Sequence, residues 1–511
     1  MNFRVSLQLA GLVLSFSTQV FAQGFVDNAL LFSRTKPGGS ARVQAMGGAQ
    51  IALGGDFSSG LSNPAGLGMY NRSEFTFSPG LNYFSTDASH NGEKEAETNS
   101  KLNIPGLSYV FNSPREDRGG FLGGSFAISM TRTNDLNTSL RYRGNDNVSS
   151  IVDWFIQDAN GTLNNDLNFD FPTGLAYDNF LIDDSTFWGG PQRFYFSALG
   201  LYDDPDDIRR LRRNGSISTK GAQYQWSFAY GGNFQDKVFF GANIGVTSMR
   251  YKFSSTYQES NFIFDLDPDY NPLDNLQLEE TIDIEGTGVN LTLGVIYRPT
   301  DFIQVGASLV TPTYYQITDS YVARLSTRWN NFNYLGTGDI LNVLSYESNA
   351  PIISEYNLVT PLKFSLGTAF FLGSYGFITG DVEFVNYRKA KYNSDISGIS
   401  FNPENEAIKA LFSNTINYRI GAEFRYNILR FRTGYNVMAN PYAASIDVDR
   451  SIKTISAGLG VRLQKFFIDM AWLRSTGRSE YSPYVFQDNT GPIVNLKNQL
   501  TSVIMSVGFT F

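Results

Sequence analysis

The residues that could carry covalent chemistry are scarce in this chain of 511 residues, which has one histidine and no cysteine. His90 lies in the polar segment Ser89-His90-Asn91-Gly92, which we interpret as a mobile loop. Histidine is the usual base that activates a serine, but a third group must orient the base, and the segment offers none. We therefore expect no enzyme activity. Because no phosphate loop and no histidine or cysteine cluster occurs, we also expect no cofactor and no metal.

Three aspartates at alternate positions, Asp265, Asp267 and Asp269, have the spacing of a calcium loop. However, Tyr270 stands where such a loop has the glycine of its sharp turn, and Leu276 stands where it has a bidentate glutamate. We interpret the segment as an acidic, solvated loop.

A mixed-charge segment, DDPDDIRRLRR at 203–213, offers arginines for lipopolysaccharide phosphates. Asp206 and Arg210 are four residues apart, which is the spacing at which opposite charges pair on a helix. We interpret the segment as a helical turn, with phosphate binding as the alternative.

The elements that would position any site are β-strands, because apolar residues alternate with small or polar ones from Glu74 onward. Aromatic residues make up 15% of the chain, yet its mean hydropathy is only −0.20, which indicates strands with one lipid face and one wet face. No segment approaches the roughly 20 apolar residues of a spanning helix. The alternating segments lie at about residues 75–83, 104–111, 121–131, 224–230, 238–246, 289–295, 303–309, 362–370, 378–384, 418–424, 429–437, 455–461, 468–472 and 503–511.

The connections between these strands alternate in length. Those after even-numbered strands are short, as at 299–301 and 464–465, whereas those after odd-numbered strands are long, the longest at about 134–221. Short turns on one rim and long loops on the other are typical of outer-membrane barrels, and an even strand number puts both chain ends at the periplasmic rim. The sequence therefore predicts an all-β fold, a transmembrane antiparallel barrel of about 14 strands at 74–511.

Charged residues in the later strands fall on the face opposite the apolar one. If the apolar face meets lipid, these charges point into the lumen and avoid the cost of about 2–4 kcal/mol for Arg or Lys at mid-membrane. We interpret them as a ladder that stiffens the wall and anchors a plug, with a solute-selective patch as the alternative. Its members are Lys363, Asp381, Glu383, Arg419, Glu423, Arg425, Arg430 and Arg432.

The two chain ends carry targeting patterns. Arg4, the mostly apolar residues 5–16 and the cleavage site Val20-Phe21-Ala22 predict a signal peptide at 1–22, so we expect an exported protein in the outer membrane. Phe511 ends a strand as in the insertion signal that barrel-assembly machinery reads, which makes that machinery an expected partner. The net charge of −8 and the pI near 5.0 argue against nucleic acid.

A glycine-rich stretch at 38–70 precedes the first strand and has neither a helical nor a strand period. Glycine permits positive φ and close backbone approach, and proline fixes φ, so the stretch packs compactly without building a core of its own. We predict that residues 23–73 form a plug, or hatch, inside the barrel. At its centre is the segment Asn63, Pro64, Ala65, Gly66 and Leu67.

This Asn-Pro-Ala-Gly-Leu segment and the preceding Ala45-Met46-Gly47-Gly48-Ala49 resemble the hatch of the FadL/TodX family of outer-membrane transporters. The resemblance implies passive uptake of hydrophobic small molecules, either long-chain fatty acids or aromatic hydrocarbons. The ligand would enter through the extracellular loops, meet the hatch and leave sideways through the wall. Outer-membrane lipid and lipopolysaccharide would be its surroundings and partners.

Particular residues would serve such transport. On the hatch, the residues expected to face the ligand are Leu53, Phe57, Leu61 and Leu67. In the longest loop, an aromatic cluster either packs locally or forms a hydrophobic groove through which the ligand enters; it includes Trp154, Phe155, Phe187 and Trp188. We predict a kink that opens the wall where the third strand begins, with a packed strand as the alternative, because glycines mark bulges. These are Gly119, Gly120, Gly123 and Gly124.

A function of another class also fits the sequence. A FadL-like barrel can bind a protein partner without transporting a solute, for example as a type IX secretion shuttle, an assembly factor or a surface adhesin. A transporter needs a continuous apolar pocket between hatch and loops, whereas a scaffold can be filled. The packing of the lumen therefore distinguishes the two.

Overall fold

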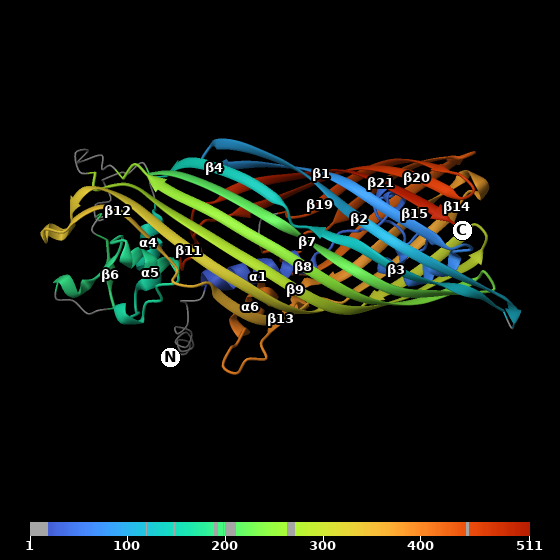
Figure 1. The fold of residues 1–511 in the computed structure, drawn as a ribbon, viewed down its shortest axis with the longest axis horizontal. Helices are drawn as coiled ribbons and strands as arrows, with labels where there is room; N and C mark the ends of the chain where they lie inside the picture. The colour runs from blue at the N-terminus through green and yellow to red at the C-terminus, as the bar shows by residue number, and fades with distance from the viewer. Residues whose placement is uncertain are drawn as a thin grey trace, which may run out of the picture.

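The computed structural model describes residues 19–118, 120–146, 149–188, 193–197, 199, 211–262, 271–445 and 449–511. Its main body is a closed antiparallel barrel in which the first wall strand pairs with the last. Figure 1 shows the long strands running from the loop end to the short-turn end, where the C-terminus lies. The predicted barrel of about 14 strands is confirmed.

Ten of the fourteen wall positions are single strands. They are β1 (Glu74–His90), β2 (Glu93–Arg118), β7 (Leu211–Phe234), β8 (Val238–Ser260), β9 (Leu273–Thr300), β17 (Asn414–Tyr426), β18 (Leu429–Met438), β19 (Ile452–Arg462), β20 (Phe466–Tyr481) and β21 (Val494–Thr510). The other four are interrupted. They are β3 (Phe121–Asp135) with β4 (Thr138–Asp146), β10 (Ile303–Val310) with β11 (Tyr314–Asn333), β12 (Ile340–Glu347) with β13 (Ile352–Val359) and β14 (Lys363–Phe371), and β15 (Gly376–Asn386) with β16 (Lys391–Asn393).

The wall presents apolar side chains outward and polar ones inward. In β8, Phe240, Ile244 and Val246 are 40–59% exposed, whereas Asn243 and Thr247 point into the lumen and are buried. An outward apolar band is the surface that a barrel needs in a bilayer, since strand edges and backbone groups are already paired. The alternate strand residues that the sequence predicted to face lipid are the ones that form this band.

The wall is much taller on one side than on the other. The strands β7, β8 and β9 have 24, 23 and 28 residues, whereas β17, β18 and β19 have 13, 10 and 11. About 9–11 residues suffice to cross a bilayer. The tall side therefore continues well beyond the apolar band towards the loops, where exposed charges such as Arg250 and Lys252 replace apolar residues.

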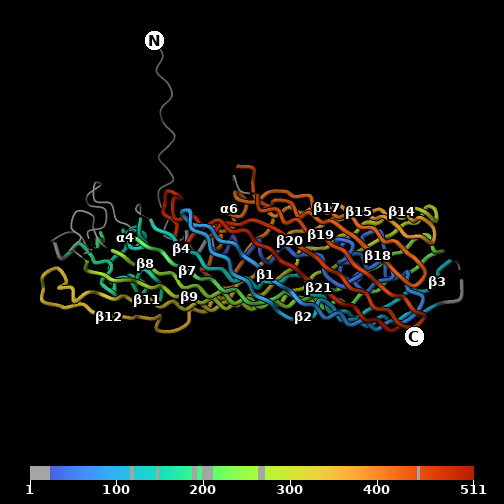
Figure 2. Tube along the Cα trace, turned by 90° about the horizontal axis from the view of Figure 1, so that it is seen from above, coloured from blue at the N-terminus to red at the C-terminus, as the bar shows by residue number. Residues whose placement is uncertain are grey.

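The chain before β1 lies inside the barrel. It contains α1 (Gln19–Ser33), α2 (Ala41–Ala45), α3 (Ser59–Ser62) and the 3-10 helix η1 (Pro64–Met69). Figures 1 and 2 show this blue segment in the lumen, with α1 nearer the loops than the rest. The expectation that both chain ends lie at the short-turn rim is therefore corrected: the C-terminus does, but the described chain begins further towards the loop end because α1 packs within the tall part of the wall.

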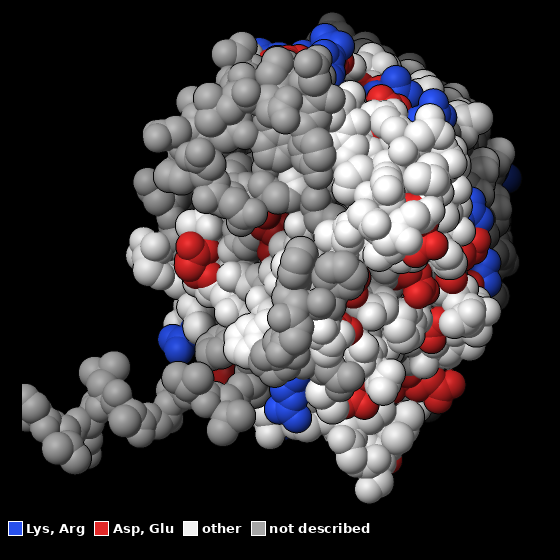
Figure 3. Space-filling view, turned by 90° about the vertical axis from the view of Figure 1, so that its left-hand side faces the viewer, with Lys and Arg blue, Asp and Glu red and all other residues white. Residues whose placement is uncertain are grey.

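The longest loop folds into a cap at the loop end. It runs from 147 to 210 rather than from 134 to 221, because β4 and β7 continue the wall beyond the apolar band. Its described elements are α4 (Ile151–Ala159), η2 (Asn164–Asp166), α5 (Pro172–Asp178), β5 (Asp183–Asp184), η3 (Ser185–Trp188) and β6 (Tyr195–Phe196). Seen end on, the described surface here is mainly uncharged, with acidic groups on both sides of the view and basic groups near its edge (Figure 3).

Shorter helices complete the loop and turn regions. These are η4 (Tyr334–Gly336), η5 (Gly373–Tyr375), η6 (Tyr387–Lys389) and α6 (Asn402–Leu411), of which α6 packs against α1. None of the helices in the described ranges is long and apolar enough to cross a membrane.

Candidate functional site: the luminal plug and its cavities

The Asn-Pro-Ala-Gly-Leu segment is the point where the plug docks on the tall wall. Asn63 caps η1, since its Oδ1 accepts a hydrogen bond from the Ala65 amide at 3.2 Å, and Pro64 occupies the first turn, where its missing N–H costs nothing. The Asn63 Nδ2 donates to the Ile51 carbonyl at 2.7 Å. A single buried side chain thus joins the two halves of the plug.

The wall makes room for this segment with glycine. A Cβ at Gly294 would collide with the Asn63 side chain, and one at Gly231 or Gly241 would collide with the backbone around Pro64. These glycines lie on β9, β7 and β8, which are three adjacent strands. Close backbone approach is the reason for glycine at these positions, and it fixes where the hatch rests.

The opposite half of the plug is tied to the wall by polar groups. The Asp381 Oδ2 on β15 accepts hydrogen bonds from the backbone amides of Gln50 at 2.7 Å and Ile51 at 3.0 Å. Ser456 and Ser506, on β19 and β21, bond plug backbone groups at 2.8–3.1 Å. Close glycine packing also occurs on this side, since a Cβ at Gly421 or Gly434 would collide with the plug backbone. The plug is therefore held by hydrogen bonds together with close glycine packing.

The predicted charge ladder lies mostly on the luminal face. Lys363 Nζ donates to the plug residue Thr35 at 2.6 Å, and Arg419 pairs with Glu383 at 2.9 Å. Arg432 bridges Glu423 at 2.7 Å and Asp469 at 2.6 Å, and Arg425 also pairs with Glu423 at 2.7 Å. Arg430 departs from the ladder, because its guanidinium donates to the carbonyls of Asn427 and Leu429 in the adjoining turn.

Three cavities surround the plug and share lining residues. The largest, of about 410 Å³, lies beside α1, while two of about 90 and 100 Å³ lie against the plug. Lys36 lines all three cavities. The walls mix apolar side chains such as Leu31, Phe84 and Leu500 with polar ones such as Asn134. Neighbouring cavities of mixed polarity therefore lie between α1 and the plug.

Lys36 is the charged group at the junction of these cavities. Burial lowers the pKa of its ammonium, and although Asp135 raises that pKa, Arg34 and Arg132 lower it further. Within the described part of the chain, no group accepts a hydrogen bond from this ammonium, since Asp135 is held by Arg132 at 2.8 Å and by Asn82. A half-buried cation that lines a cavity and has no fixed partner favours an anionic guest.

Most hatch residues that were expected to face a ligand instead face the wall. Leu53, Phe57 and Leu67 are buried, at 4% exposure or less, against wall residues such as Phe377 and Val110. A plug that fills a barrel buries its own apolar side chains against the wall. The expectation that Leu53, Phe57 and Leu67 face a ligand is therefore wrong. Leu61 is half-buried and lines one of the small cavities.

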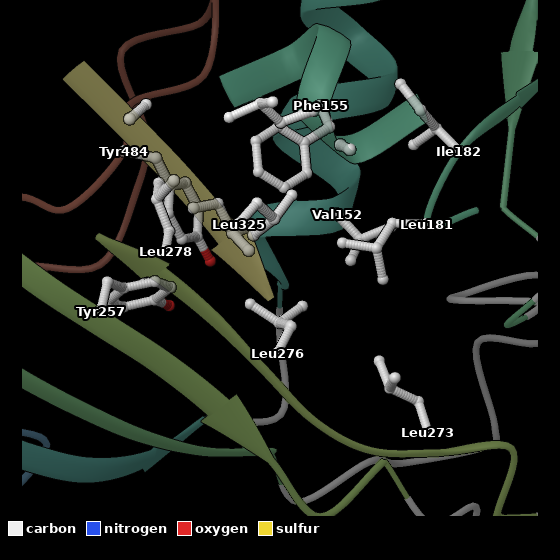
Figure 4. Close-up of a cluster of buried hydrophobic side chains, with 14 of the residues drawn as sticks. Val152, Phe155, Leu181, Ile182, Tyr257, Leu273, Leu276, Leu278, Leu325 and Tyr484 are labelled. Atoms are coloured by element: carbon white, nitrogen blue, oxygen red, sulfur yellow. The ribbon is translucent and has the colours of Figure 1, made fainter. Parts of the chain in front are cut away.

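The aromatic loop cluster belongs to the core of the cap. Phe155 is fully buried and packs with Leu276 and Leu325 of the tall wall, and Trp154 packs at the edge of the same cluster (Figure 4). Local packing is thus the observed arrangement for these two. The side chains of Phe187 and Trp188 lie outside the described residues.

The wall is closed where the third strand was expected to open it. Gly119 lies outside the described residues, and Gly120 and Gly123 have positive φ of 91° and 112°. The register of β3 against β7 shifts between Phe121 and Gly123, at the short-turn rim, and again between Arg132 and Asn134, near its other end. From Gly123, β3 pairs β2 and β7 without a break up to Thr131. The predicted opening is therefore corrected to a bulge at the rim, because Gly124 packs against Gly231 and Tyr230.

His90 is fixed in place and does not lie in a loop. It ends β1, is 2% exposed, and its Nδ1 lies 2.9 Å from the Ile493 carbonyl. The loop expectation overlooked an Asn-Gly hairpin: Asn91 and Gly92 have φ of 46° and 85°, as a tight two-residue turn between β1 and β2 requires.

The two ion-binding segments contribute little to the described site. Asp265, Asp267 and Asp269, and residues 203–210, lie outside the described residues. Leu211 to Arg213 begin β7, so this part of the expected helical turn is a strand. The described ranges contain no group of three or more histidines, cysteines or carboxylates that could hold a metal.

The sequence interpretation missed α1 and the residues that follow it. Val26, Ala29 and Phe32 recur at helical spacing, and all three are buried against the inner wall. Arg34 then donates to the carbonyls of Met438 and Ala439. The helical period was the available signal for α1; nothing in the sequence pointed to Lys36.

Comparison with known proteins shows likeness in fold. No protein-family model matches the chain, and no curated protein matches it. A crystal structure of a Pseudomonas aeruginosa FadL homologue superposes with a TM-score of 0.54 and 12% identity, over 93% of this chain and 99% of the other. A P. putida toluene transporter, TodX, gives 0.48 and 14%, over 93% and 99%. The FadL-like barrel fold, with its plug, therefore covers nearly the whole chain.

Proposed function

We propose that the protein is an outer-membrane channel for passive uptake of hydrophobic small molecules, with the plug as its gate. The barrel fold shared with a FadL homologue and the outward apolar band support an outer-membrane channel. The observation that carries the proposal is the set of neighbouring cavities between α1 and the plug, all three of which Lys36 lines. These cavities give a ligand somewhere to bind before the plug moves.

Among hydrophobic ligands, an amphiphile with an anionic head, such as a long-chain fatty acid, suits this space better than a hydrocarbon. Leu31, Phe84 and Leu500 offer contacts for an acyl chain, and Lys36 offers a charge-assisted hydrogen bond for a carboxylate. Hydrogen bonds to charged groups contribute about 1.5–3 kcal/mol. An aromatic hydrocarbon would leave the half-buried Lys36 without compensation for its charge.

The exit lies at a seam between β10/β11 and β13/β14, where the strands are interrupted next to a cavity. Pro312 and Pro361 interrupt these neighbouring strands at the same level and lack the N–H that a ladder needs. The two strands are joined there by the Thr313 amide on the Thr360 hydroxyl at 2.9 Å and the Thr360 amide on the Thr313 carbonyl at 3.0 Å. One small cavity reaches Thr311, Thr313 and Pro361.

Uptake by whole cells tests the proposal, because the lipopolysaccharide leaflet slows apolar solutes in the absence of a channel. Cells that lack their own fatty-acid uptake barrel are given labelled oleate or labelled toluene, with or without this protein. We expect oleate uptake to rise several-fold with the protein, and Lys36→Met to remove most of that rise. The matched control is Lys252→Met, on the exposed outer wall. Uptake equal to that of cells without the protein would refute the channel.

Partner binding without transport is the second candidate, and the closed loop end favours it. The cap buries Val152, Phe155 and Leu181 against the inner face of the tall wall, which fills the region above α1. A filled mouth suits a scaffold, such as an assembly factor or secretion subunit. If the protein is folded in the outer membrane and uptake of both solutes stays at the background level, this function is favoured.

A further inference from the structure

Positive charge is in excess inside the barrel at its short-turn end, below the plug. Five guanidinium groups lie there, and four of them pair with one or both of the carboxylates of Glu423 and Asp469, while Arg430 pairs with neither. The five are Arg42, Arg425, Arg430, Arg432 and Arg462. One further carboxylate, that of Glu74, lies near Arg462. This excess is local, because the whole chain carries a net charge of −8.

The two carboxylates are already fully used. Glu423 pairs with Arg432 at 2.7 Å, with Arg425 at 2.7 Å and more loosely with Arg42 at 3.6 Å. Asp469 pairs with Arg432 at 2.6 Å and with Arg462 at 3.2 Å. Arg432 lies between both acids and is almost fully buried, so it leaves one net negative charge for the other arginines. The charges of the outer arginines are therefore only partly compensated.

Arg425 and Arg430 show this imbalance most clearly. They are direct cross-strand partners on β17 and β18, and like charges in that position destabilise a sheet. Of these two arginines, only Arg425 pairs with Glu423, since Arg430 donates to the carbonyls of Asn427 and Leu429 at 2.7 and 2.8 Å. An anion between the two guanidiniums would turn this repulsion into attraction.

These side chains are both oriented and reachable. Arg425 lies over the ring of Phe377 at 5.3 Å and Arg462 over that of Phe467 at 4.0 Å, which fixes the planes of their guanidiniums. Their side chains are 31% and 28% exposed, whereas Arg432 is 1% exposed. The Arg462 amide donates to the Ile428 carbonyl at 2.9 Å, so the end of β19 is fixed beside the β17–β18 turn.

The site lies at the level of a membrane surface. Next to it, Tyr426 at the end of β17 is 67% exposed, and Leu463 and Ile428 in the adjoining turns are 54% and 43% exposed. Aromatic and apolar residues at this depth meet the head-group region of a bilayer. Arginines beside this depth can therefore reach a lipid phosphate as well as a free anion from the periplasm.

We propose that Arg425, Arg430 and Arg462 form a binding site for a phosphate group at the periplasmic mouth. The planar guanidinium fork matches phosphate oxygens and binds them in pairs. The phosphate comes either from an anionic phospholipid of the inner leaflet or from a free phosphate ion. This site is separate from the cavities above the plug and does not depend on uptake of a hydrophobic ligand.

Native mass spectrometry of the purified full-length barrel in neutral detergent tests the site. The probes are phosphatidylglycerol, and diacylglycerol as a matched lipid without phosphate. We expect phosphatidylglycerol adducts on the wild type and few diacylglycerol adducts. Arg430→Gln, which touches neither carboxylate, should weaken the phosphatidylglycerol affinity about fivefold, the effect expected of one surface arginine. Arg430→Lys should retain most of it.

One control variant, a second test variant and a competition with inorganic phosphate complete the experiment. Arg250→Gln, an exposed arginine paired with Glu285 near the loop end, should bind as the wild type does. Arg462→Gln gives a second test if Arg430→Gln does not fold, as judged by its heat-modifiable mobility. Inorganic phosphate that displaces the lipid indicates a site open to the free ion, whereas binding of the lipid alone indicates a head-group site. Equal adducts with both lipids, or unchanged affinity in both variants, would overturn the proposal.

Discussion

The Asn63 side chain holds the plug together and caps η1. Asn63→Ala removes the cap of η1 and leaves the Ile51 carbonyl without its buried donor. Loss of a cap costs about 1 kcal/mol and an unsatisfied buried group about 1–3 kcal/mol. We expect the plug amides to exchange with deuterium at least tenfold faster in this variant, while the wall strands stay protected.

Asn63→Asp separates the two roles of this side chain. The aspartate keeps an acceptor for the Ala65 amide but turns a buried carboxylate oxygen towards the carbonyls of Ile51 and Val295, so its amides should exchange at least as fast as those of Asn63→Ala. If all three proteins exchange alike, the docking of the plug does not depend on Asn63.

Asp158 makes the stability of the cap depend on pH. Burial raises the pKa of this carboxyl, although a hydrogen bond from Thr173 lowers it. Its folded-state pKa therefore lies above the unfolded value, so the contribution to stability is fully present at low pH and is lost as the pH rises through the folded pKa. In Asp158→Asn, exchange of the α5 amides, corrected for intrinsic rates, should lose this pH dependence and be slower at pH 7. A variant as pH-dependent as the wild type would contradict this assignment.

At the scale of elements, strands could be predicted wherever contact with lipid makes apolar and polar residues alternate. Phe240, Ile244 and Val246 of β8 alternate because one face meets hydrocarbon. Beyond the bilayer, Arg250 and Lys252 of the same strand meet water, so hydrophobicity no longer alternates and the tall wall was not foreseen. The ligand-facing residues were misjudged for a related reason, since Phe57 and Leu67 are apolar in order to pack on the wall.

The proline seam allows a direct test of the exit route, which rests on the proposed uptake. The chain has no cysteine, so Thr313→Cys with Thr360→Cys introduces one defined disulfide across the seam. Oxidation should block oleate uptake, and reduction should restore it. The control pair, Ser308→Cys with Ser365→Cys, bridges the same two strands where the ladder is unbroken. Equal uptake before and after oxidation of the seam pair would exclude this exit.

For the whole molecule, the plug fits the shape of the barrel lumen, and the inner wall around the plug is polar. Asp381, Glu423 and Arg432 are buried only because the plug and the opposite charges cover them. Without the plug, water would hydrate these groups, and the pairing of the wall would be unchanged. The barrel should therefore fold without residues 23–69 and form a wide aqueous pore.

Planar-bilayer conductance measures this consequence. The intact protein should show little ion current, since plug and cap close the lumen, and the variant without residues 23–69 should show a large, steady current. Asn63→Ala should show brief openings between these extremes, because it weakens the hold of the plug and leaves its bonds to Asp381 in place. A steady current through the intact protein would mean that the plug does not seal the barrel, and gating would then have to reside in the cap.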